Sequence, residues 1–119
     1  MGDTNYFENL KIKIDEFANN RDWPQFHTPR NLATSISIEA AELLECFQWN
    51  DISKEELLSS FELKQSVEDE LADIMIYCLR FCSSLDFDVI KIMCDKIDKN
   101  NLKYPISKAK GTSKKYNKL

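Results

Sequence analysis

Glu39-Ala40-Ala41-Glu42 is the stretch around which this chain is organised, and Glu70-Leu71-Ala72-Asp73 repeats its pattern later in the sequence. Each stretch places two carboxylates three residues apart, so both lie on one face of an α-helix. Each pair also borders an apolar stripe with helical period. Two helices that pack these stripes together would bring four carboxylates to the border of a hydrophobic core.

The two apolar stripes recur at the spacing of amphipathic helices. The first comprises Ile36, Ala40, Leu43, Leu44 and Phe47. The second comprises Val67, Leu71, Ile74, Cys78, Leu79 and Cys82. We expect the two stripes to be buried against each other.

Four carboxylates at the border of a core require compensation, because unpaired buried charge is very costly. A divalent cation would supply it, and oxygen ligands without His or Cys favour magnesium or manganese over zinc. The hypothesis is therefore a metal site formed by Glu39, Glu42, Glu70 and Asp73. The alternative is that these acids merely solvate the outer faces of amphipathic helices.

Length and glycine content limit the fold. A chain of 119 residues is long enough for one domain with a real core. The two glycines, Gly2 and Gly111, lie near the ends, so the folded body is expected to contain none. This argues against tight β-hairpins and against a glycine-rich phosphate loop. The expected fold is all-α.

Charge is distributed unevenly along the chain. Residues 103–119 carry six lysines and no acid, which leaves 10 basic against 20 acidic residues in the remainder. So acidic a body argues against nucleic acid as a partner. We place the helical domain at residues 1–106 and assign residues 107–119 to a basic tail that we expect to be mobile.

The cysteines and the hydropathy pattern point to the cytoplasm. None of the four cysteines forms a Cys-x-x-Cys pair, and all lie in apolar helical runs. We expect them to be reduced, buried side chains. The sequence shows neither a signal peptide nor an apolar run of membrane length, so no membrane partner is expected.

Periodicity and capping residues predict the helices. We expect them over residues 3–19, 28–48 and 53–58, from 62–66 to 84, and over 88–104. Thr28 and Pro29 form an N-cap followed by proline at the first helical position. Ser53 opens a capping box, and Asp88 caps the last helix. The protomer is thus a bundle of four to five helices.

The connector over residues 21–27 carries Trp23, Phe26 and His27, the single histidine of the chain. Aromatic side chains in a loop usually pack against the core. Beside a metal site, the same loop could grip a planar base.

The last long helix displays a polar stripe. Lys96, Asn100 and Lys103 follow one another at spacings of four and three. The stripe either solvates the surface or allows the lysines to meet phosphate oxygens.

Six motifs follow one another along nearly the whole chain. They are Phe17-Ala18-x-x-Arg21-Asp22-Trp23-x-Gln25-Phe26-His27-x-Pro29-Arg30-Asn31-Leu32, Glu39-x-x-Glu42, Phe47-Gln48-Trp49, Glu70-Leu71-Ala72-Asp73-x-x-x-Tyr77, Lys96-x-x-x-Asn100-x-x-Lys103-Tyr104-Pro105 and Lys110-Gly111-x-x-x-Lys115-Tyr116. In this order the motifs resemble the MazG-like all-α nucleoside triphosphate pyrophosphohydrolases. They are most similar to the dCTP pyrophosphatase branch.

The resemblance implies hydrolysis of a nucleoside triphosphate to the monophosphate and pyrophosphate. The substrate that it favours is dCTP or a modified dCTP. It implies magnesium, or manganese in its place, held by the four acids. Glu39 or Glu42 would take the proton of the attacking water, and Lys96 would stabilise the leaving pyrophosphate. The resemblance also implies a homodimer or a tetramer built from dimers.

Further residues acquire roles from the same resemblance. Trp23, His27 and Trp49 would form the base and sugar pocket. Sugar or phosphate contacts would come from Tyr77, Lys96, Asn100, Lys103 and Tyr104.

Two positions depart from the pattern. Ile14 occupies a first-helix position at which dCTP-preferring members have histidine. Lys103 precedes Tyr104 where arginine is common, which keeps the charge but loses the bidentate fork.

Three alternatives remain open. A di-iron carboxylate bundle would require Glu-x-x-His pairs, and His27 is expected in a loop away from both acidic stretches. A helical interaction module would leave the acids solvated and need no cation. Within the family, dUTP or another non-standard triphosphate is the alternative substrate.

Overall fold

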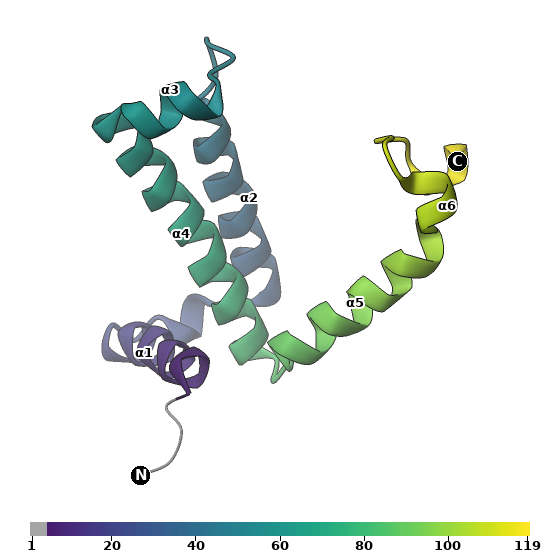
Figure 1. Cartoon of the computed structure of the whole chain (residues 1–119). Helices are drawn as coiled ribbons and strands as arrows, with labels where there is room; N and C mark the ends of the chain where they lie inside the picture. Colours follow the sequence, from purple (N-terminus) through teal and green to yellow (C-terminus); the bar gives the residue numbers. More distant parts are fainter. Residues whose placement is uncertain (1–4) are drawn as a thin grey trace. The chain divides into compact units, whose positions relative to one another are not determined.

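Helices make up the regular structure of this chain. The structure, a computed structural model, describes residues 5–119, and within that range it contains no strand (Figure 1). The elements are α1 (Tyr6–Asn20), η1 (Pro24–Phe26), α2 (Pro29–Glu45), α3 (Lys54–Ser59), α4 (Phe61–Ser84), α5 (Val89–Lys103), α6 (Ile106–Ala109) and η2 (Tyr116–Lys118). The all-α prediction is confirmed; the expected helix start at Asp3 lies outside the described residues.

Contacts divide the chain into two compact units. The first extends to Asp86 and the second comprises Phe87–Leu119. The domain limits expected from the sequence stay a prediction. Within residues 5–119, every helix is too short or too polar to cross a lipid bilayer.

In the first unit α2 and α4 lie side by side, and α1 and α3 each pack against α4 (Figure 1). Leu32, near the start of α2, is only 1% exposed. Because α2 carries the first acidic stretch and α4 the second, this packing brings the two stretches onto facing helices.

The expected caps are present. Thr28 Oγ1 accepts a hydrogen bond from the Asn31 amide at 3.2 Å, and Pro29 follows at the first helical position. The Ser53 and Asp88 side chains cap α3 and α5 in the same way. These three helix starts are confirmed.

Two helix limits differ from expectation. α4 begins at Phe61 because Ser60 Oγ accepts the Leu63 amide at 3.3 Å, a cap that the sequence analysis missed. α2 ends at Glu45 rather than Gln48, and the chain continues in turns as far as Trp49.

The end of α1 fixes the aromatic loop that follows. Asp22 adopts φ 56°, a left-handed conformation that short polar residues tolerate. The Trp23 amide then bonds to the Ala18 carbonyl and the Asp22 amide to the Asn19 carbonyl, which is a Schellman motif. Its usual apolar contact is made by Trp23 and Phe17, whose ring centroids lie 5.5 Å apart. Local backbone geometry thus positions Trp23.

The predicted burial of the apolar stripes and cysteines is only partly correct. Leu44 is 70% exposed, and Leu71 is also exposed. All four cysteines are free, but Cys78 and Cys94 are exposed and the other two are half-buried. The physical reason is that the helices of a single chain cover only part of each stripe.

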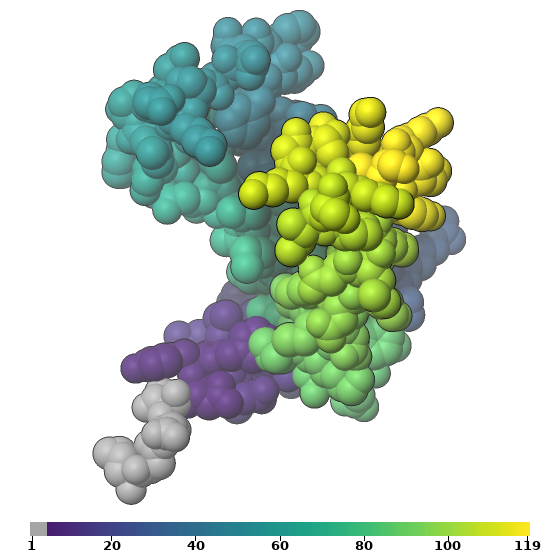
Figure 2. Space-filling view, turned by 45° about the vertical axis from the view of Figure 1, so that its right-hand side comes forward, coloured from purple at the N-terminus to yellow at the C-terminus, as the bar shows by residue number. Residues whose placement is uncertain are grey.

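In the second unit the end of the chain folds back on α5. The Tyr116 ring meets the Tyr104 ring edge-on at 6.2 Å, and Lys103 Nζ lies 4.9 Å from the Tyr116 ring centroid. In Figure 2 these C-terminal residues gather in yellow at the end of the green helix. On α5, Val89 is buried, whereas Ile92, Met93, Ile97 and Leu102 are exposed.

Candidate active site

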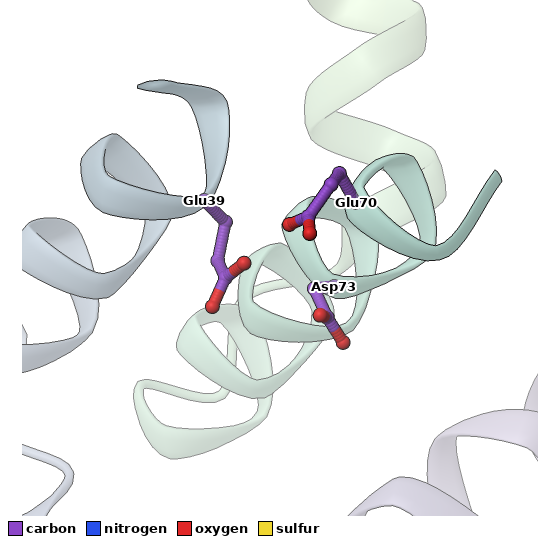
Figure 3. Close-up of side chains that lie close together, drawn as sticks. All are labelled: Glu39, Glu70 and Asp73. Carbon is purple, nitrogen blue, oxygen red and sulfur yellow. The ribbon is translucent and has the colours of Figure 1, made fainter. Parts of the chain in front are cut away.

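Three carboxylates from α2 and α4 converge in the first unit. Glu39 reaches from α2 toward Glu70 and Asp73 on α4 (Figure 3). One oxygen from each side chain lies within 4.8 Å of an oxygen from each of the others. The arrangement follows from the sequence, because a spacing of three places Glu70 and Asp73 on one face of α4.

Glu42 lies next to this group of three carboxylates but is not one of its members. It lies outside the set of three, but its carboxyl group interacts with the carboxyl groups of Glu39 and Glu70. All four acids named from the sequence are therefore neighbours.

Two of these acids are not simply solvated, although Asp73 is exposed. One carboxylate oxygen of Glu39 and one of Glu70 are buried without a hydrogen-bond partner. A buried acceptor left unpaired is costly, and two of them face the same group of acids. An all-oxygen donor set with unsatisfied acceptors fits a hard divalent cation such as magnesium.

The crowding also alters protonation. Burial raises the pKa of Glu39 to about 7 from its ordinary 4.5, and the neighbouring Glu42, Glu70 and Asp73 carboxyls add to the rise. The Glu42 carboxyl is the main cause of a raised pKa at Glu70. A cation among the acids would reverse this effect, because it favours the charged form of each carboxylate.

A pocket of about 460 Å³ adjoins the acids. Glu39, Asp73 and Tyr77 line it together with the loop residues Trp23 and His27. Its remaining wall is contributed by Leu10, Lys13, Ile14, Phe17, Ala18, Ile76 and Arg80. The pocket thus combines a carboxylate side with an apolar, aromatic side.

His27 lies in the loop between η1 and α2, outside both acidic stretches, and it lines this pocket together with Glu39 and Asp73. The loop approaches the acids because Asn31 Nδ2 donates to the Phe26 carbonyl at 2.9 Å, which ties the loop to the start of α2. His27 is nevertheless absent from the group of converging metal ligands. The di-iron alternative therefore gains no histidine ligand.

Trp49 does not line this pocket. Trp49 is 84% exposed and lines a separate depression formed by residues 47–52. Lys96, Asn100, Lys103 and Tyr104 belong to the second unit. Their roles stay predictions.

Arg80 is the centre of an interaction that was not expected from the sequence. The Arg80 side chain, on α4, is buried. Its Nε donates a hydrogen bond to His27 Nδ1 at 3.0 Å, and its Nη1 donates one to Asp15 Oδ1 at 3.0 Å. A signal was available: Arg80 is the one charged residue between Asp73 and Ser84, and it shares a helix face with Asp73 and Tyr77.

Comparison with known proteins gives a consistent result. The profile of the MazG-like family matches residues 34–119. The chain is 35% identical over 114 residues to dCTP pyrophosphatase 1 of Rattus norvegicus and 35% identical over 113 residues to that of Homo sapiens. Each alignment covers 94% of this chain and 66% of the relative, so the chain spans a little less than two thirds of these relatives' length.

A solved structure extends the likeness to three dimensions. The crystal structure of a pyrophosphatase from Archaeoglobus fulgidus superposes with a TM-score of 0.79 at 43% sequence identity. The superposition covers 88% of this chain and 97% of the other.

Proposed function

The chain belongs to the MazG-like family, and from that premise we propose that it is a nucleoside triphosphate pyrophosphohydrolase acting on dCTP or a modified dCTP. The observation that carries the proposal is the group of Glu39, Glu70 and Asp73 beside a pocket with an aromatic wall. The acids suit a cation that binds phosphates, and the aromatic wall suits a planar base.

Magnesium, or manganese in its place, would be held by Glu39, Glu70 and Asp73, with Glu42 beside them. When bound, the cation neutralises phosphate charge and makes the α-phosphorus more electrophilic. The carboxylates orient the attacking water, and a glutamate on α2 takes its proton. Glu42 is the better candidate for that role, because it contacts the group of three without belonging to it.

The apolar side of the pocket would receive the nucleoside. Trp23 supplies an aromatic surface, and Tyr77 lines the same pocket. Ile14 is buried at the position where a histidine would otherwise offer a second ring. An aliphatic side chain offers no hydrogen bond to a base and so discriminates weakly among pyrimidines. The alternative substrate is therefore dUTP or another non-standard triphosphate.

Four residues of the second unit complete the proposal by family resemblance. Lys96 and Lys103 would balance charge on the leaving pyrophosphate, while Asn100 and Tyr104 would contact sugar or phosphate. Trp49 would reach a base from its exposed position in another subunit.

Association of subunits is supported by uncovered apolar surface. Large apolar side chains exposed on α1 and α4 include Leu10, Ile12, Phe17, Leu71, Met75 and Ile76. Exposed apolar surface of this extent is typical of an interface between subunits. We expect light scattering to report a homodimer or a tetramer; a monomer at micromolar concentration would contradict this expectation.

The reaction is tested by its products. Incubation of the protein with magnesium and dCTP is expected to yield dCMP and pyrophosphate, separated by anion-exchange chromatography. Release of dCDP and orthophosphate would refute attack at the α-phosphorus. A parallel panel of dUTP, dTTP and 5-methyl-dCTP measures base preference, and turnover of dUTP above dCTP would establish the alternative substrate.

A further inference from the structure

Asp15, Arg80 and His27 form a chain of polar contacts, of which the family resemblance assigns a role to His27 alone. Arg80 on α4 is 9% exposed and connects two segments distant in sequence, α1 through Asp15 and the aromatic loop through His27. Both donor–acceptor distances are 3.0 Å. The Asp15 carboxylate compensates the buried guanidinium, whose charge would otherwise be costly.

The direction of the bond to His27 defines the state of the ring. A guanidinium has only donors and is not deprotonated in proteins. His27 Nδ1 must therefore accept with its lone pair, so the single proton of the neutral ring lies on Nε2. Burial lowers the pKa of His27, and the Arg80 charge lowers it further, which agrees with a neutral ring.

The His27 ring belongs to the wall of the pocket. His27 lines the pocket with Ile14, Phe17 and Trp23, and it meets the Trp23 ring edge-on at a centroid distance of 6.2 Å. These are apolar and aromatic neighbours, among which a base would be received. Because Arg80 occupies Nδ1, the Nε2–H of the neutral ring is the one donor that His27 can offer to a ligand.

We propose that Asp15 and Arg80 are positioning residues that hold His27 as the neutral Nε2–H tautomer, so that its ring donates one hydrogen bond to a carbonyl oxygen of the bound base. The ligand class is a pyrimidine, which offers O2 as an acceptor in both the cytosine and the uracil series. The proposal rests on the proposed function for the ligand, but the tautomer is a property of the free protein. The two can therefore fail separately.

The tautomer is measured directly, because His27 is the single histidine of the chain. In protein labelled with ¹⁵N-histidine, a long-range ¹H–¹⁵N spectrum near neutral pH is expected to show an unprotonated Nδ1 and a protonated Nε2, without tautomer averaging. Arg80→Met is expected to move both nitrogen shifts toward the averaged values of a free imidazole. An Nδ1–H tautomer in the wild type, or identical spectra for the two proteins, would overturn the proposal.

Kinetics separate positioning from a merely structural role. Arg80→Met is expected to raise KM for dCTP about tenfold while kcat stays within about threefold, because a base contact is made equally in the ground and transition states. Arg80→Lys, which keeps the charge and a donor, is expected to recover part of the loss. Lys64→Met is the matched control, since it removes an exposed ion pair with Glu68 on the same helix and should change neither KM nor the spectrum.

The outcomes remain distinct. If Arg80→Met fails to fold by circular dichroism, Asp15→Asn takes its place, and unchanged His27 shifts in that variant would overturn the proposal. If the wild type is active and Arg80→Met leaves both KM and the tautomer unchanged, the positioning proposal alone fails. If the wild type hydrolyses no nucleoside triphosphate, the proposed function fails, and the proposed base contact fails with it, while the spectrum still decides the tautomer.

Discussion

Replacing Glu39 by glutamine is expected to lower kcat/KM for the nucleoside triphosphate by at least about 100-fold. The amide keeps the size of the side chain but removes the charge from a group whose oxygens converge with those of Glu70 and Asp73. Asp73→Asn is expected to have a comparable effect. Steady-state release of pyrophosphate, followed with a coupled assay under saturating magnesium, measures the change.

Two further variants test whether the loss of kcat/KM is specific to the carboxylates that would hold the cation. Glu45→Gln lies on the same helix with an exposed side chain, and we expect it to retain wild-type activity. Glu42→Gln should lose turnover but keep stabilisation by magnesium, if Glu42 takes the proton rather than holding the cation. Wild-type turnover by Glu39→Gln would show that the charge of the Glu39 carboxylate is not needed for the reaction.

The second large effect concerns stability as a function of pH. The pKa of Glu39 is about 7 in the metal-free folded chain, against an ordinary value of 4.5. Between these two pH values Glu39 is therefore protonated in the folded state and ionised in the unfolded state. The contribution of Glu39 to the free energy of unfolding is then fully present below pH 4.5 and is lost as pH rises through about 7. Urea denaturation with EDTA across this range measures the slope.

Magnesium should counteract that loss. Binding to the folded state alone adds about 2.7 kcal/mol when free cation is 100 times its Kd. The gain should be greater above pH 7 than near pH 4.5, where protons compete for the same oxygens. Glu39→Gln should flatten the pH dependence and lose most of the gain. An equal response of this variant and the wild type to magnesium would contradict the assignment.

Short-range features of this chain could be read from its sequence. Thr28, Ser53 and Asp88 cap helices because their side chains reach an amide three residues ahead, which is a local property. The meeting of Glu39 with Glu70 and Asp73 was also predictable, because each acid borders a stripe that packs against the other helix.

Long-range features could not be read in the same way. Arg80 and His27 are separated by 53 positions, and no spacing rule connects a helix to a loop at that distance. Periodicity defined the apolar face of α2 but not what covers it, so the exposure of Leu44 was missed. Trp49 was placed with Trp23 by family resemblance; turns after α2 carry it to a different depression of this chain, and its role stays a prediction.

Glu39 on α2 and Glu70 and Asp73 on α4 are expected to bind a divalent cation together. Crystals grown with manganese and a non-hydrolysable dCTP analogue test it most directly, through anomalous diffraction at the manganese edge. The account predicts an anomalous peak among Glu39, Glu70 and Asp73, in contact with phosphate oxygens of the analogue. A bound analogue with no peak among these carboxylates, or with the metal held elsewhere, would contradict it.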